Sequence, residues 1–136
     1  MNSQPFLFPP PSANGLAPDI AHVFWPLCAP LSAQDAVALK AAVAEHTDRV
    51  RLALQRNEFL DLAAAEALAQ GLTALLDLYP GCAPAHQALI VGATRYFVRQ
   101  DDAEGDLVSV LGFDDDATVF NYVAGAVGRP DLKVAL

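Results

Sequence analysis

The sequence predicts an all-α protein: a single compact bundle of four or five helices that follows a proline-rich N-terminal tail. Apolar residues recur at helical spacing along most of the chain, no alternating strand pattern persists, and serine, proline and glycine stand where helices would begin or end. A chain of 136 residues, 54% of them hydrophobic, can bury a core as one domain. We therefore expect residues 18–136 to form a single helical domain and residues 1–17 to form an extended tail.

The tail carries Pro5, Pro9, Pro10 and Pro11. Proline fixes φ and lacks a backbone N–H donor, so we expect an extended or polyproline-like conformation. Two interpretations are open. The tail lies over the surface of the domain, or it is a ligand for an aromatic groove on another protein.

Two helices are expected in the first part of the domain. A short helix runs from Pro18 to Leu27, because proline suits a first turn and further prolines end the segment. A longer helix begins after Ser32, which opens a sequence similar to a capping box, and continues to about residues 55–57. Its apolar residues recur every three or four positions, at Ala36, Leu39, Val43, Val50 and Leu54.

A third helix is expected over residues 59–78, which are rich in leucine and alanine. Gly71 lies inside it and costs about 1 kcal/mol relative to alanine, so we expect a close crossing with another helix at this point. Only Asp61, Glu66 and Asp77 bring charge to this helix. Its surface is therefore the expected contact if the protein forms a homodimer.

Two further helices are expected near the C-terminus. One begins at Pro84, and the last covers about residues 116–127, with Asp114 or Asp115 as its N-cap. Gly128 supplies the C-cap of the last helix. The segment between these helices is either one helical turn or an extended strand-like run, and its periodicity does not decide between them.

The most chemically biased stretch of the chain is residues 93–119. It carries seven of the sixteen acidic residues, and no basic residue follows Arg99 within it. The acids surround a short apolar run that ends at Gly112. They are Asp101, Asp102, Glu104, Asp106, Asp114, Asp115 and Asp116.

Part of this stretch, residues 96–116, resembles the signature of the YkvA-like family, a bacterial family of unknown function. The resemblance is carried without a gap by a Tyr-Phe-Val start, a Val-Leu-Gly-Phe run and four aspartates: Asp102, Asp106, Asp115 and Asp116. It implies a small helical domain, often adjacent to membrane segments in relatives, and no agreed activity. The chain departs from the family pattern where Gln100, Gly105 and Ser109 replace three prolines and where Asp101, Glu104 and Asp114 replace apolar residues.

The four matching aspartates have two interpretations. In the first they are structural: they cap helices, at about 1 kcal/mol per cap, and pair with arginines, Arg95 being placed to reach Asp115 or Asp116. In the second, all four are oxygen ligands for a divalent cation such as Ca²⁺ or Mg²⁺, although the spacing is not that of an EF-hand loop. The additional acids Asp101, Glu104 and Asp114 are the residues expected to contact a partner.

Cysteine and histidine give no sign of a metal site. Cys28 and Cys82 are far apart and form no Cys-x-x-Cys motif, so both are expected to be small buried residues. The three histidines lack zinc-ligand spacing. His22 and His46 lie among apolar residues, and we expect both to pack within the domain.

The net charge of −8 argues against a nucleic-acid partner, because phosphate binding needs clustered lysine and arginine. An acidic protein is better matched to a basic protein surface or to cations. No run approaches the ~18 apolar residues that a membrane span needs, and no export signal opens the sequence, so a cytoplasmic location is expected.

These observations predict a non-enzymatic protein-interaction module without a cofactor, in which an acidic connector at residues 101–116 docks on a basic partner. No catalytic residue is assigned, because the sequence has no Gly-rich phosphate loop and no Gly-x-Ser-x-Gly motif. Two alternatives stay open. One is a divalent-cation-binding domain, and the other is an immunity or antitoxin-like protein that binds a basic toxin.

Overall fold

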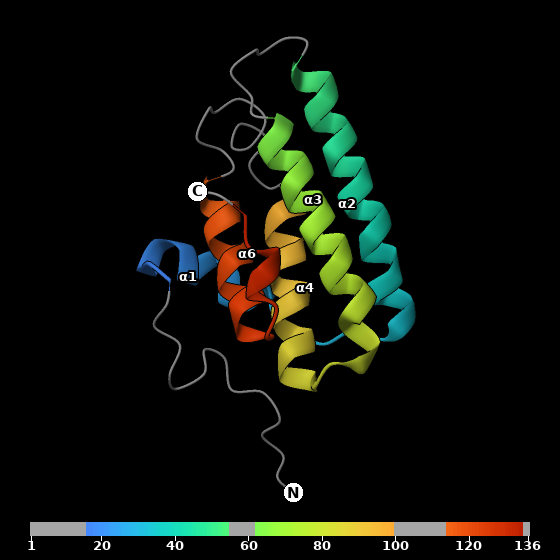
Figure 1. Ribbon diagram of the computed structural model, residues 1–136, viewed down its shortest axis with the longest axis vertical. Coiled ribbons are helices and arrows are strands. Elements are labelled where there is room, and N and C mark those ends of the chain that lie inside the picture. The colour runs from blue at the N-terminus through green and yellow to red at the C-terminus, as the bar shows by residue number, and fades with distance from the viewer. Residues whose placement is uncertain (1–15, 55–61, 100–113, 135–136) are drawn as a thin grey trace, which may run out of the picture.

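The computed structural model describes residues 16–54, 62–99 and 114–134. These residues are helical, with no strand among them, and this confirms the predicted all-α class for the part of the chain that is described (Figure 1). Most of the proline-rich tail lies outside the described residues. The described α-helices are α1 (Pro18–Phe24), α2 (Ala33–Leu54), α3 (Leu62–Leu78), α4 (Pro84–Val98) and α6 (Asp114–Ala126), and short 3-10 helices cover Trp25–Leu27, Tyr79–Gly81 and Pro130–Leu132.

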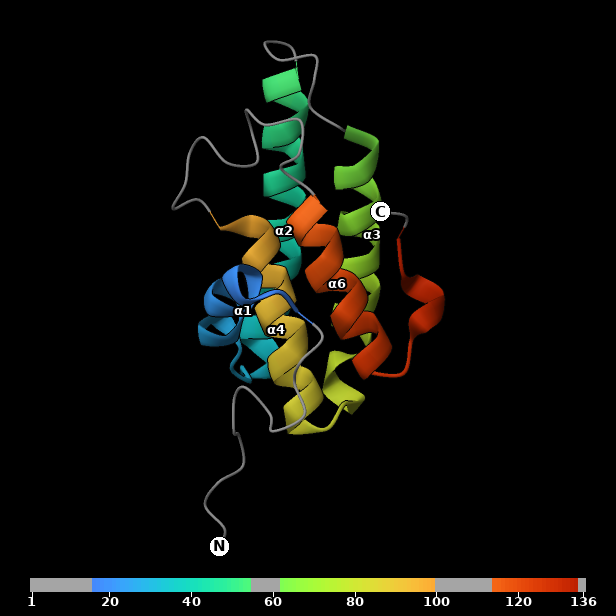
Figure 2. The ribbon, with the colours of Figure 1, turned by 90° about the vertical axis from the view of Figure 1, so that its left-hand side faces the viewer.

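The four long helices form a bundle in which consecutive helices alternate in direction (Figures 1 and 2). Helix α2 lies antiparallel beside α3, and α6 packs against both α3 and α4. The short helix α1 crosses the bundle on the side formed by α4 and α6. The outer surface of the α2–α3 pair is left uncovered by the other described helices.

Each of the α-helices in the described part of the chain contributes side chains to one hydrophobic core. Burying a large aliphatic or aromatic side chain contributes about 1.5–3 kcal/mol, so this core is the main source of stability. Its largest fully buried members include Phe24 from α1, Val43 and Val50 from α2, Leu68, Leu72 and Leu75 from α3, Ile90 and Phe97 from α4, and Phe120 from α6.

The glycines inside α3 and α4 mark close approaches between elements. A Cβ added at Gly71 would overlap the ring of Phe120, which confirms the predicted helix crossing and identifies α6 as the partner. A Cβ added at Gly92 would overlap Cys28 Sγ and the ring of Phe24. Both glycines therefore let a bulky neighbour approach a helix backbone.

The predicted caps of two helices are present. At the start of α2 the backbone N–H of Asp35 donates to Ser32 Oγ at 3.1 Å, as expected from the sequence similar to a capping box. Beyond the end of α6, Gly128 has a φ of 86°, and Arg129 N–H donates to Ala124 O at 2.8 Å. This is a Schellman C-cap, which needs a residue without a side chain at the left-handed position.

Helix α6 begins at Asp114, about two residues earlier than predicted. The prediction that Asp114 or Asp115 precedes the helix as its N-cap is therefore wrong: Asp114, Asp115 and Asp116 occupy the first turn itself. An acid in the first turn of a helix is still favoured, because the helix dipole is positive at that end.

Tyr79 ties the start of α2 to the end of α3. Its hydroxyl accepts the backbone N–H of Leu31 at 2.5 Å and donates to the carbonyl of the same residue at 2.6 Å. The carbonyl of Tyr79 in turn accepts Gln87 Nε2 at 2.9 Å, which adds α4 to the connection. Because Tyr79 is buried, these bonds fix the positions of the α2 start, the α3 end and the first turns of α4 relative to one another.

Among the described helices, none is both long and apolar enough to cross a membrane.

Candidate functional site

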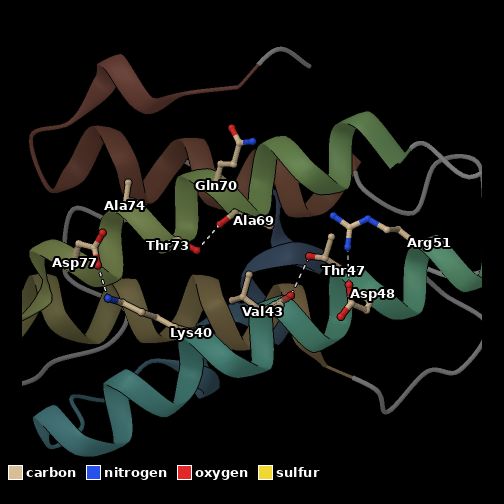
Figure 3. Close-up of a pocket in the computed structure, with 11 residues that line it drawn as sticks. Lys40, Val43, Thr47, Asp48, Arg51, Ala69, Gln70, Thr73, Ala74 and Asp77 are labelled. Carbon is tan, nitrogen blue, oxygen red and sulfur yellow. Dashed lines mark hydrogen bonds and ion pairs between the residues drawn. The ribbon is translucent and has the colours of Figure 1, made fainter.

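A groove of about 430 Å³ runs between α2 and α3 on the uncovered side of the bundle (Figure 3). It is open to solvent along its length, and both helices supply its walls. The residues that line it are Lys40, Val43, Ala44, Thr47, Asp48 and Arg51 from α2, and Ala69, Gln70, Thr73, Ala74 and Asp77 from α3.

The floor of the groove is made of small and mostly apolar side chains. Two threonines lie in it, and their hydroxyls are satisfied within their own helices. Thr47 Oγ1 donates to Val43 O at 2.9 Å, and Thr73 Oγ1 donates to Ala69 O at 2.8 Å. Neither hydroxyl proton is therefore available to a ligand, so the threonines offer no hydrogen-bond donor to the groove.

Ion pairs bridge the two helices at both ends of the groove. At one end Lys40 Nζ pairs with Asp77, and at the other Arg51 Nη2 lies 3.1 Å from Glu66 Oε2. Arg51 also contacts Asp48 Oδ1 at 2.5 Å. Because these pairs are exposed, each contributes about 0–1 kcal/mol, so they define the groove ends more than they stabilise the fold.

Both bridges have the same spacing on their helices. Lys40 and Arg51 are eleven residues apart on α2, and Asp77 and Glu66 are eleven residues apart on α3. Eleven residues span about 16 Å, or three turns, and bring the side chains back to the same face of the helix. The groove between the bridges is therefore about three helical turns long.

The described large hydrophobic side chains that are exposed all belong to α2 and α3: Val37 (62% exposed), Leu52 (61%) and Leu78 (36%). Val37 shares a helical stripe with Ala44 in the groove wall, and Leu78 is one turn from Ala74. Leu52 follows Arg51 directly at the other end. Val37 and Leu78 therefore extend the apolar surface past the Lys40–Asp77 bridge.

The acidic connector is described only in part. Asp101, Asp102, Glu104 and Asp106 lie outside the described residues, and Asp114 opens α6. Asp115 is exposed, whereas Asp116 is buried with 4% exposure. Within the part of the chain that is described, no three His, Cys, Asp or Glu side chains gather as a metal site would require. The cation site at Asp102, Asp106, Asp115 and Asp116 stays a prediction.

Asp115 and Asp116 gather with two residues at the end of α4. The Arg99 guanidinium lies 4.4 Å from the centre of the Tyr96 ring. Burial raises the pKa of Tyr96, the bond to Arg99 lowers it, and the negative charges of Asp115 and Asp116 raise it further. This cluster joins the end of α4 to the start of α6, which favours the structural interpretation of the two aspartates.

Arg95 lies elsewhere. A pairing with Asp115 or Asp116 was predicted, but Arg95 Nη1 donates to Leu27 O at 3.1 Å, at the end of the 3-10 turn after α1. The positive charge of Arg95 also lowers the pKa of the nearby Cys28 thiol, against the larger rise that burial causes. Arg95 therefore holds the α1 segment against α4.

The cysteines and histidines do not line the groove. Cys28 and Cys82 are free thiols and half-buried, so the expectation of full burial holds only in part. His46 is buried, with 1% exposure. Its ring packs edge-on against the ring of Phe97, with the two ring centroids 4.8 Å apart. His22 is exposed, contrary to prediction, because the two-turn helix α1 buries Ile20 and Phe24 on its opposite face.

Sequence reasoning missed the groove because no single helix contains it. One signal was available: two basic residues eleven apart in one helix and two acidic residues eleven apart in the next. In an antiparallel helix pair, such a pattern places opposite charges face to face at two levels. Recognising it requires the relative shift of the two helices, which their separate periodicities do not determine.

No family model matches the chain, and no curated protein or solved structure matches it either. The resemblance to the YkvA-like family therefore stays a prediction.

Proposed function

We propose that this protein is a non-enzymatic protein-interaction module and that the α2–α3 groove receives a helical segment of a partner protein. The observation that carries the proposal is the groove itself, with its apolar floor and its charged bridges about three turns apart. An amphipathic helix laid in an apolar groove is a recurrent mode of peptide recognition.

The dimensions of the groove suit a helix. Packed helices lie 8–10 Å apart, and the closest approaches need small side chains at the contact. Ala44, Ala69 and Ala74 line the groove, so a third helix can come close to both of its walls. A bound segment of about three turns would reach from one bridge to the other.

The surroundings of the groove favour a macromolecule over a small ligand. Small-molecule sites usually enclose 70–90% of their ligand, whereas this groove is open along one whole side. The exposed side chains of Val37 and Leu78 extend the apolar surface beyond the Lys40–Asp77 end of the groove. Exposed apolar surface beside a groove is typical of protein–protein contacts.

The other functional hypotheses from the sequence stay predictions. The acidic connector at residues 101–116 lies outside the described residues except for Asp114, Asp115 and Asp116, and its docking role stays a prediction. The same holds for divalent-cation binding and for an immunity or antitoxin-like role. The groove is a separate surface, and its proposed use requires none of them.

Site-specific photo-crosslinking tests the proposal. A photoreactive phenylalanine analogue replaces Ala44 or Ala74 in the groove, and in matched controls it replaces Ala85 on α4 or Ala126 on α6, which are exposed elsewhere. In cells that make the protein, both groove positions should capture the same partner, and the captured peptide should belong to a helix. Equal capture from the control positions, or none from the groove, would refute the proposal.

A further inference from the structure

We infer that the helix received by the α2–α3 groove is amphipathic and basic, with lysine or arginine at both ends of an apolar stripe three turns long. The inference rests on the proposed function and adds the chemistry of the partner. It follows from the charge around the groove, from the spacing of that charge, and from the way α2 already pairs with α3.

The rim of the groove carries an excess of accessible carboxylates. Three acids and two bases form the bridges. At one end the side chain of Asp77 is 60% exposed, against 36% for Lys40. At the other end Asp48 is 69% exposed and Arg51 is 49% exposed, with Glu66 on the opposite wall. A cation that arrives at either end therefore meets a carboxylate with oxygen surface open to it.

The spacing of these carboxylates sets the spacing in the partner. Asp77 lies at one end of the groove and Glu66 at the other, eleven residues or about three turns apart on α3. On a helix laid between α2 and α3, residues i and i+11 share one face and are separated by about 16 Å. Residues i+4 and i+7 lie between them on that face, over Ala44, Ala69 and Ala74. Small or aliphatic side chains suit these two positions.

The α2–α3 pair contains an example of this recognition. Helix α2 presents Lys40 and Arg51 at i and i+11, and α3 answers with Asp77 and Glu66 at the same spacing. Mostly small side chains, alanines and threonines among them, lie between the two bridges. A basic helix in the groove would repeat this pairing with Asp77 and Glu66, whose side chains are still 60% and 42% exposed.

A second copy of the chain is a weaker match. Its own basic stripe on α2 is engaged with α3, and the residues between Lys40 and Arg51 include Val43 and Thr47, which are 1% and 4% exposed. To offer that stripe, the second copy would have to open its own helix pair. The occupant to which the observations point is therefore a helix of another protein.

Three synthetic helical peptides test the inference. They share one apolar stripe and differ only at positions i and i+11, which are both lysine, both glutamine or both glutamate. Fluorescence anisotropy measures their binding to the full chain at low and high salt. We expect the lysine peptide to bind about five- to tenfold more tightly than the glutamine peptide, and the glutamate peptide to bind most weakly. The differences should shrink with salt.

Variants of the chain assign the effect to the groove. The double variant Glu66→Gln with Asp77→Asn should bind the lysine and glutamine peptides equally. The matched control, Asp19→Asn with Asp131→Asn, changes the net charge by the same amount away from the groove and should keep the preference for lysine. Loss of the preference in both double variants would show an effect of overall charge, and would overturn the inference.

The remaining outcomes separate the inference from the proposed function. Equal affinity for all three peptides, abolished by Ala44→Arg, would overturn the basic partner and leave helix binding in the groove intact. Absence of binding by any peptide at millimolar concentration would overturn both. A dimer detected by light scattering, and lost in Ala44→Arg, would make a second copy the occupant and overturn the inference.

Discussion

Phe120 of α6 fills the space that a side chain at Gly71 of α3 would occupy. The ring is 1% exposed, so its neighbours hold it on all sides, and the α3 backbone forms one wall of its site. The same helix α3 supplies one wall of the groove with its opposite face. Packing at Gly71 therefore supports the position of α3, on which the groove depends.

Replacing Gly71 with alanine should destabilise the protein by about 1–2 kcal/mol. Overpacking against the enclosed Phe120 ring costs about 1–3 kcal/mol, and the better helix propensity of alanine returns up to about 1 kcal/mol. Urea unfolding measures the difference. The control is Gly125→Ala at an exposed position of α6, which should be neutral or slightly stabilising. Equal stability of Gly71→Ala and the wild type would show that the ring can move aside.

Replacing Tyr79 with phenylalanine should cost about 1–3 kcal/mol of unfolding free energy. The change keeps the buried ring but removes the hydroxyl that bonds both backbone groups of Leu31, and leaves those groups without this partner. Thermal unfolding should show the loss. Tyr122→Phe is the matched control, since Tyr122 is half-buried and its contacts with Phe24 and Trp25 are made by its ring. A similar loss in both variants would contradict the role given to the Tyr79 hydroxyl.

Asn121 should control the exchange of the Val134 amide with solvent. Its side chain accepts Val134 N–H at 2.8 Å and donates to Val134 O at 2.9 Å, and so holds the chain after α6 against that helix. In Asn121→Ala, hydrogen exchange at Val134 should accelerate at least about tenfold. Asn121→Asp keeps the acceptor and should retain part of the protection. Unchanged exchange in Asn121→Ala would mean that other contacts hold the segment.

The two thiols should differ in reactivity. Burial raises the pKa of the Cys28 thiol to about 12, and the nearby Arg95 offsets only a little of this. Burial also raises the pKa of Cys82, but this thiol is closer to the surface. Because the thiolate is the reactive form, iodoacetamide at pH 8 should modify Cys82 first and Cys28 mainly after unfolding. Mass spectrometry of Cys28→Ala and Cys82→Ala identifies the site, and faster reaction at Cys28 would refute the prediction.

The raised pKa of Cys28 also predicts a loss of stability in alkali. The thiol ionises near pH 9.0 when unfolded and near pH 12 when folded, so the unfolded state holds fewer protons between these values. The contribution of Cys28 to stability is therefore complete below about pH 9 and falls as the pH rises toward 12. In denaturant titrations, the stability advantage of the wild type over Cys28→Ala should narrow across this range. A difference in stability that stays constant across this pH range would contradict the raised pKa of Cys28.

The helices could be predicted because the signals for them are local. Ser32, Pro84 and Gly128 act on the backbone within a few residues, and the structure has a helix start or end at each. The start of α6 was misplaced because three consecutive aspartates suit both an N-cap and a first turn. Local composition does not distinguish these two positions.

The candidate site could not be predicted in the same way, because it depends on how helices are placed against each other. Gly71 indicated a crossing, but only the fold shows that Phe120 is the neighbour. Arg95 was predicted to pair with Asp115 or Asp116, yet its guanidinium donates to the carbonyl of Leu27, 68 positions earlier in the chain. Lys40 and Asp77 are 37 positions apart, and nothing local to either residue indicates that they meet.

The inward hydrogen bonds of Thr47 and Thr73 have a consequence for water. With both hydroxyl protons committed to backbone carbonyls, water over the groove floor finds few donors to hold it in place. Displacing such weakly held water by apolar groups favours association. Calorimetry of a groove-binding helix should accordingly show a negative heat-capacity change, the thermodynamic signature of apolar surface withdrawn from solvent.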